Sequence, residues 1–307
     1  MTPAPRRARA AGPGWAAGSL RLAEVVRVQQ RQLQAVIARL GESGVEDVHQ
    51  GRVAARRLRS ILKTFGPLFD ARWARLYRMD LRSFARALAM VREADVHGEV
   101  LRDTVGSREA LRSAELARLA AALQLARSDV RDHLRRRGTE HGWRALSASL
   151  AARAEQPMRI ARSDADMAEL LGLADRAWRK ANRLMKRHPQ EAQQLHELRL
   201  ALKHCRYALE VVVDVERKSA ARLLRRLRRA QEAIGAHRDT IAAAHWVRSR
   251  ERTLGRATVR RLEDLLVERE ELLRRDATEQ SAKVLPAYEA WREAIRPLRK
   301  AARPGRA

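Results

Sequence analysis

The stretch VHQGRVAARRLRSILKTF, residues 48–65, places basic side chains at the spacing of one helix face. They occur at i, i+3, i+7, i+10 and i+14, namely His49, Arg52, Arg56, Arg59 and Lys63. At about 100° per residue, these five positions fall within roughly 80° of arc. The opposite side carries Val48, Ala55, Leu58, Ile61, Leu62 and Phe65. The stretch therefore predicts a helix that packs with one face and presents a ladder of cations on the other.

A second copy of this ladder, LHELRLALKHCRYALEVV, occupies residues 195–212. An ungapped offset of 147 residues pairs the ladder positions with His196, Arg199, Lys203 and Arg206, and Glu210 stands where the first copy has Lys63. Arg and Lys make up 64 of 307 residues, so chance basic matches are common, but only 9 residues are histidine. The matched histidine favours an internal duplication over two unrelated helices whose charged faces are merely solvated.

The two ladders, together with LAMVREADVHGEVL (88–101) and IGAHRDTIAAAHWV (234–247), resemble the CHAD family, helical domains named for their conserved histidine. The resemblance spans about residues 20–300. It implies two halves packed with pseudo-twofold symmetry around a shared basic groove or pore, and an association with inorganic polyphosphate and its granules. The family's Arg-Asp-x-Asp pattern is altered at Glu93 and at Ile241. We therefore expect Glu93, Asp95 and Asp239 to orient neighbouring arginines rather than to catalyse.

Helical periodicity continues along the chain and no alternating strand pattern appears, so the predicted fold is all-α. We expect two four-helix-bundle-like halves at residues 19–157 and 164–301, together one CHAD domain, preceded by a disordered basic tip at residues 1–18. Breaks at glycine and proline set the expected helices: 20–40, 48–65, 71–101, 108–137, 143–154, 167–187, 195–212, 217–250, 258–275 and 280–300.

The net charge of +27 and the pI near 11.6 predict an acidic partner: nucleic acid, an anionic membrane surface or a phosphate polymer. Guanidinium groups in a row suit a linear polymer of phosphates. The predicted polyphosphate site comprises both ladders, with the two histidines either contacting the ligand or only supporting the bundle. A second tier of candidates also matches at offset 147: Arg78, Arg82, Arg225 and Arg229.

Catalytic motifs are missing from the sequence: it has no HExxH metal helix, no GxxxxGK[ST] loop and no GxSxG elbow. Cys205 is the single cysteine, and its helix neighbour His204 would point elsewhere, so we expect the thiol to be a buried packing residue. We predict a non-catalytic polyphosphate-binding protein with no metal site and no cofactor.

Two other functions stay open: non-specific nucleic-acid binding, and a scaffold or regulator of a polyphosphate-metabolising enzyme. Single-stranded nucleic-acid binders stack bases on exposed aromatics, whereas Phe65, Phe84, Tyr207 and Trp246 fall at apolar helix positions and are expected in the core. No run of about 18 apolar residues predicts a membrane span, and the first twenty residues contain no secretory core. We expect a cytoplasmic protein that associates with polyphosphate granules.

Overall fold

The computed structural model describes residues 18–39, 45–106, 111–139, 141–155 and 165–301, and within them the all-α prediction is confirmed because no strand occurs. The first half contains α1 (Gly18–Arg39), α2 (Val45–Thr64), α3 (Ala71–Ala87), α4 (Ala89–Val105), α5 (Ser113–Thr139) and α6 (His141–Glu155). The second contains α7 (Met167–Met185), α8 (Ala192–Val212), α9 (Arg217–Arg248), α10 (Glu251–Leu254), α11 (Arg256–Ala282), α12 (Val284–Ala294) and α13 (Arg296–Ala301). The predicted tip at 1–18, apart from Gly18, and the predicted boundary at 156–163 lie outside the described residues.

Two predicted helices are divided in the structure. The stretch 71–101 ends as α3 and restarts as α4 around Leu88, whose φ of −86° and ψ of 2° do not continue an α-helix. The predicted helix 280–300 begins within α11 and divides twice, at Lys283 and at Ile295, which lies ahead of Pro297. Proline has no N–H and is tolerated in the first turn of a helix but not in its interior, which explains why α13 starts there.

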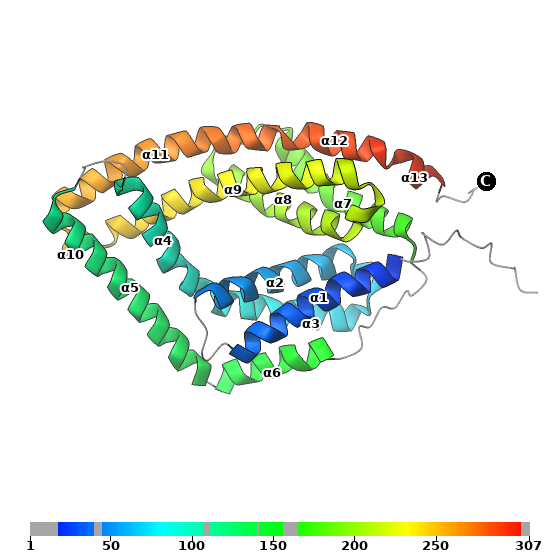
Figure 1. The fold of residues 1–307 in the computed structure, drawn as a ribbon, viewed down its shortest axis with the longest axis horizontal. Coiled ribbons are helices and arrows are strands. Elements are labelled where there is room, and N and C mark those ends of the chain that lie inside the picture. Colours follow the sequence, from blue (N-terminus) through cyan, green and yellow to red (C-terminus); the bar gives the residue numbers. More distant parts are fainter. Residues whose placement is uncertain (1–17, 40–44, 107–110, 140, 156–164, 302–307) are drawn as a thin grey trace, which may run out of the picture.

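The described residues form two hydrophobic clusters, and both halves of the chain contribute to each. The larger joins α1, α2 and α3 to α7, α8, α9 and α12, and its fully buried side chains include Leu58, Phe84 and Trp178. The smaller packs α4 and α5 against α9 and α11, with Leu101 and Leu262 fully buried. Figure 1 shows α11 and α12 running along one edge of the molecule and α5 crossing between them and α6. The chain therefore folds as one interlocked structure.

The starts of α1 and α7 are joined directly. The backbone N–H and the hydroxyl of Ser19 both donate to the carbonyl of Ala165 at 3.1 Å. A Cβ on Gly18 would lie 2.6 Å from backbone atoms of Asp166, so only glycine permits this approach. The contact brings residues 146 positions apart in sequence together at the same end of the molecule.

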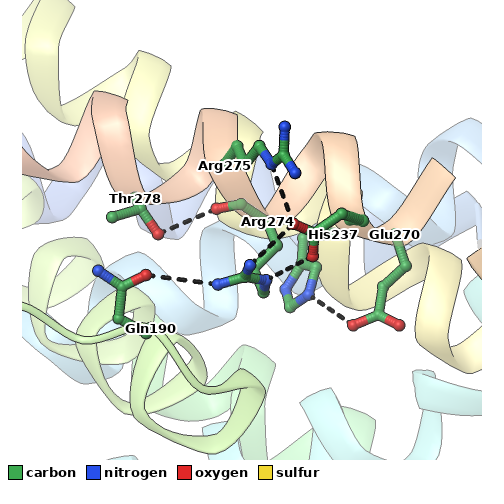
Figure 2. A network of polar contacts seen from close by, with 7 residues as sticks. Gln190, His237, Glu270, Arg274, Arg275 and Thr278 are labelled. Carbon is green, nitrogen blue, oxygen red and sulfur yellow. Dashed lines mark hydrogen bonds and ion pairs between the residues drawn. The ribbon is translucent and has the colours of Figure 1, made fainter. Parts of the chain in front are cut away.

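His237, from the second CHAD-like signature, holds α9 against α11. Its side chain is 1% exposed, and its Nε2 lies 3.2 Å from Oε1 of Glu270 (Figure 2). In the same network Arg274 donates from Nη1 to Gln190 at 3.3 Å, which ties α11 to the segment before α8. This histidine therefore has a packing role.

The aromatic residues expected in the core are buried, as predicted: Phe65, Phe84, Tyr207 and Trp246 are at most 8% exposed. Cys205 is fully buried as well, and burial raises the pKa of its thiol, so it stays a neutral packing group. None of the described helices combines the length and apolarity needed to cross a bilayer.

Candidate functional site

The two ladder helices contact each other through their C-terminal halves. His204 on α8 inserts between two hydroxyls of α2, with Nδ1 2.6 Å from Ser60 Oγ and Nε2 3.2 Å from Thr64 Oγ1. Burial, followed by the charges of Lys63 and Arg78, lowers the pKa of His204 to about 4. The imidazole is therefore neutral at physiological pH and can donate one of these hydrogen bonds and accept the other.

A cavity of about 540 Å³ opens beside this contact, between α2, α3 and α8. Among the described residues that line it, seven are basic and none is acidic. The α2 wall supplies Arg56, Arg59 and Lys63 at i, i+3 and i+7, and the α3 wall repeats that spacing with Arg75, Arg78 and Arg82. The lining is completed by Ser60, Met79, Leu200, Lys203, His204 and Tyr207. We refer to this cavity as the basic pocket.

The cations of the basic pocket repel one another. The pKa of Arg59 is lowered by burial and by Arg82, Arg56, Arg78 and Arg86, in that order. The Nε atoms of Arg56 and Arg78 are buried without a hydrogen-bond partner among the described residues. Crowded, partly desolvated guanidinium groups without a carboxylate are stabilised by an anion that enters the pocket.

The structure brings together six of the residues predicted from sequence, Arg56, Arg59, Lys63, Arg78, Arg82 and Lys203, and leaves others outside the pocket. Arg206 does not line it: its guanidinium lies over the Tyr207 ring, 5.0 Å from the centroid, and pairs with Glu210 at 3.4 Å. Arg225 and Arg229 are exposed on α9 and are not among the lining residues.

The first arginine of each ladder is bonded to the backbone. Arg52 donates from Nη1 to the Leu88 carbonyl at 2.7 Å, and Arg199 donates from Nε to the Gln231 carbonyl at 3.2 Å. Arg199 also packs on Gly235, where a Cβ would come within 2.9 Å of its Nη2. Arg52 therefore ties α2 to the junction of α3 and α4, and Arg199 ties α8 to α9.

The two ladder histidines are half-buried and do not line the basic pocket. Burial lowers the pKa of His196, and the charges of Arg238, Arg199 and Lys203 lower it further. His196 is therefore predominantly neutral at physiological pH. His49 lies at the start of the other ladder, nearer the N-terminal end of α2 than the residues that line the pocket.

The acids of the CHAD-like signatures lie next to arginines. Asp95 pairs with Arg127 of α5 at 3.3 Å. Asp239 acts on Arg199 by raising its pKa, against the lowering by burial. Both placements agree with the expected orienting role, while the side chain of Glu93 lies outside the described residues.

Sequence reasoning missed several residues of the pocket. Arg75 had a readable signal, because residues 75, 78 and 82 repeat the i, i+3, i+7 spacing of residues 56, 59 and 63. Met79 and Leu200, which are 59% and 54% exposed, had none. Met79 and Leu200 become pocket residues only because α3 and α8 pack beside α2, and the sequence of one helix does not reveal that packing.

Comparison with known proteins agrees with this architecture. The CHAD domain family model matches residues 21–248. Among solved structures, PptA from Streptomyces chartreusis has a TM-score of 0.68 and 24% identity, covering 88% of this chain and 99% of its own. The crystal structure of the CHAD domain from the plant Ricinus communis also has a TM-score of 0.68, with 23% identity over 92% of this chain and 97% of its own. No curated protein matches. The chain belongs to the CHAD domain family.

Proposed function

We propose that this protein binds inorganic polyphosphate in the basic pocket without converting it chemically. The observation that carries the proposal is the lining itself, in which seven basic residues from three helices surround one cavity and no described acidic residue takes part. Arginine forks donate two parallel hydrogen bonds to phosphate oxygens and stay charged at physiological pH. Long-range attraction by the net charge of +27 would bring the polymer to the pocket.

The association of CHAD proteins with polyphosphate supports the same proposal, and it extends to binding at polyphosphate granules. The position of the aromatic side chains also favours polyphosphate over single-stranded nucleic acid as the ligand. The described aromatic side chains are buried, so the base-stacking surface of single-stranded nucleic-acid binders is missing from the described part of the chain. A scaffold for a polyphosphate-metabolising enzyme would use the same pocket to hold the shared polymer.

The proposal is tested by titrating the protein with long-chain polyphosphate at about 0.15 M salt. Duplex and single-stranded DNA are added as competitors at equal phosphate concentration. We expect polyphosphate to bind about a hundredfold or more tightly than either DNA, since its adjacent phosphates, with no sugars or bases between them, can pair with several guanidinium groups of the pocket at once. Equal competition by DNA would mean that net charge alone causes binding. A pull-down that recovers an enzyme after polyphosphate digestion would favour the scaffold function.

Glu210 is expected to weaken binding in the natural sequence. It pairs with Arg57 at 3.5 Å and with Arg206 at 3.4 Å, next to the Tyr207 wall of the pocket. Glu210→Ala releases both guanidinium groups, and we expect polyphosphate to bind about three- to tenfold more tightly, as measured by titration at fixed salt. Glu289→Ala removes one exposed acid from α12 and is the control. An equal gain in both variants would trace the effect to net charge.

A further inference from the structure

Lys203 is unusual in a chain whose cations are mostly arginine. Only seven of the 64 basic residues are lysines, and Lys203 occupies the ladder position at which the first copy has Arg56. Its side chain is half-buried in the α8 wall of the basic pocket. An arginine in this place could not lose its proton, whereas a lysine can, and a neutral amine is a nucleophile.

The surroundings of Lys203 favour the neutral amine. Burial, and then the charges of Arg199, Arg56, Arg206 and Arg238, lower its pKa to about 7. Nearby carboxylates act on other cations, since Glu210 pairs with Arg57 and Arg206 and Asp239 acts on Arg199. The neighbouring His196 and His204 are neutral at physiological pH and supply no counter-charge. The Lys203 amine is therefore uncharged in part near neutral pH, where an ordinary lysine is almost fully protonated.

We propose that Lys203 is a nucleophilic acyl acceptor, and that it reacts with acyl phosphates whose phosphate group is held by the arginines of the basic pocket. In this step Nζ attacks the acyl carbonyl carbon, and a C–N bond forms as the bond from that carbon to the phosphate oxygen breaks. Inorganic phosphate leaves with the electron pair, and the proton lost by the amine goes to the leaving phosphate or to solvent. The proposal rests on the proposed function only in that both require the pocket to bind phosphate groups.

The pocket favours this class of electrophile for two physical reasons. Guanidinium groups next to the amine, Arg56 and Arg59 among them, stabilise the charge that develops on a departing phosphate. They also concentrate a phosphate-bearing reagent beside an amine that is already deprotonated in part. Acylation replaces a titratable amine by a bulkier neutral amide in the pocket wall, so the modified protein binds polyphosphate more weakly.

The full chain is allowed to react with acetyl phosphate at pH 6, 7, 8 and 9. Peptide mass spectrometry then gives the rate at which each lysine is acetylated. Lys63 lines the same pocket but is exposed, and Lys180 is exposed on α7, so both serve as internal controls. At pH 7 we expect Lys203 to react at least about ten times faster than either control. Its rate should level off above about pH 8, once most of the amine is neutral, while the control rates keep rising.

A phosphate-free acetyl donor, p-nitrophenyl acetate, separates recruitment by the pocket from simple amine reactivity. We expect the preference for Lys203 over Lys180, which lies outside the pocket, to fall with this donor, and polyphosphate to protect Lys203 from acetyl phosphate. Reaction of Lys203 no faster than Lys63 with acetyl phosphate overturns the inference, as does an undiminished preference over Lys180 with p-nitrophenyl acetate. Polyphosphate binding by the unmodified protein is measured separately, so a failure of the proposed function stays distinguishable from a failure of this one.

Discussion

Replacing Arg56, Arg59, Arg78 and Arg82 together by Ala is expected to weaken polyphosphate binding by at least about a hundredfold, or about 2.7 kcal/mol. These four residues come from two facing helices and line one cavity. Each charge-assisted hydrogen bond contributes roughly 1.5–3 kcal/mol, so the expected loss is well within what four such groups supply. The helical content should stay unchanged, because the variant removes cations that crowd one another in the pocket and keeps the buried apolar faces of α2 and α3. Isothermal titration, with circular dichroism to verify folding, measures both quantities.

The matched control removes the same number of charges from another surface. Arg176, Arg179, Lys180 and Arg183 are all exposed on α7, and none lines the basic pocket. Their joint replacement by Ala is expected to reduce affinity less than about tenfold, through the loss of long-range attraction alone. If the two quadruple variants lose affinity equally, the basic pocket is not the binding site.

Leu202→Ala is expected to lower the free energy of unfolding by about 2–5 kcal/mol, the usual cost of a cavity left by a buried leucine. Leu202 is fully buried on α8, within the larger hydrophobic cluster that α8 shares with α2 and α7. A domain of ordinary stability has only about 5–15 kcal/mol in total, so this single change removes a large part of it. Urea unfolding followed by circular dichroism gives the difference from the shift of the midpoint.

Leu200→Ala is the control for that measurement. Leu200 is two residues away on the same helix but 54% exposed at the pocket, so the same chemical change is expected to cost no more than about 0.5 kcal/mol. Equal losses of stability in the two variants would contradict the placement of α8. The comparison is insensitive to helix propensity, because both substitutions replace leucine by alanine within one helix.

Much of the fold could be predicted from the periodicity of the sequence. The boundaries of α2, α7, α8 and α9 lie within about three residues of the predicted ones, because amphipathic spacing and breaks at glycine or proline are local signals. The division at Leu88 had no such signal. Its carbonyl is used by Arg52, a partner 36 residues away, which no local pattern reveals.

The candidate site shows the same limit at the level of single arginines. Equivalent ladder positions have different roles: Arg59 lines the pocket, whereas Arg206 lies over Tyr207 and is neutralised by Glu210. The sequence contained the substitution that matters, Glu210 in place of Lys63, but not the geometry that brings Arg57 to the same carboxylate. A charge pair between helices depends on how the helices are packed.

The sequence by itself determined that this protein is all-α, that it carries two basic ladders, and that its charge suits a polyanion. All three properties follow from residue spacing along single helices or from composition, and none of them depends on how the helices pack together. Only the tertiary structure decided which cations face one cavity and which are bonded to backbone or carboxylates. It also decided that Lys203 is partly desolvated among arginines. Burial and the distances between charges arise when α2, α3 and α8 pack together, and these quantities set whether a basic side chain binds, supports or reacts.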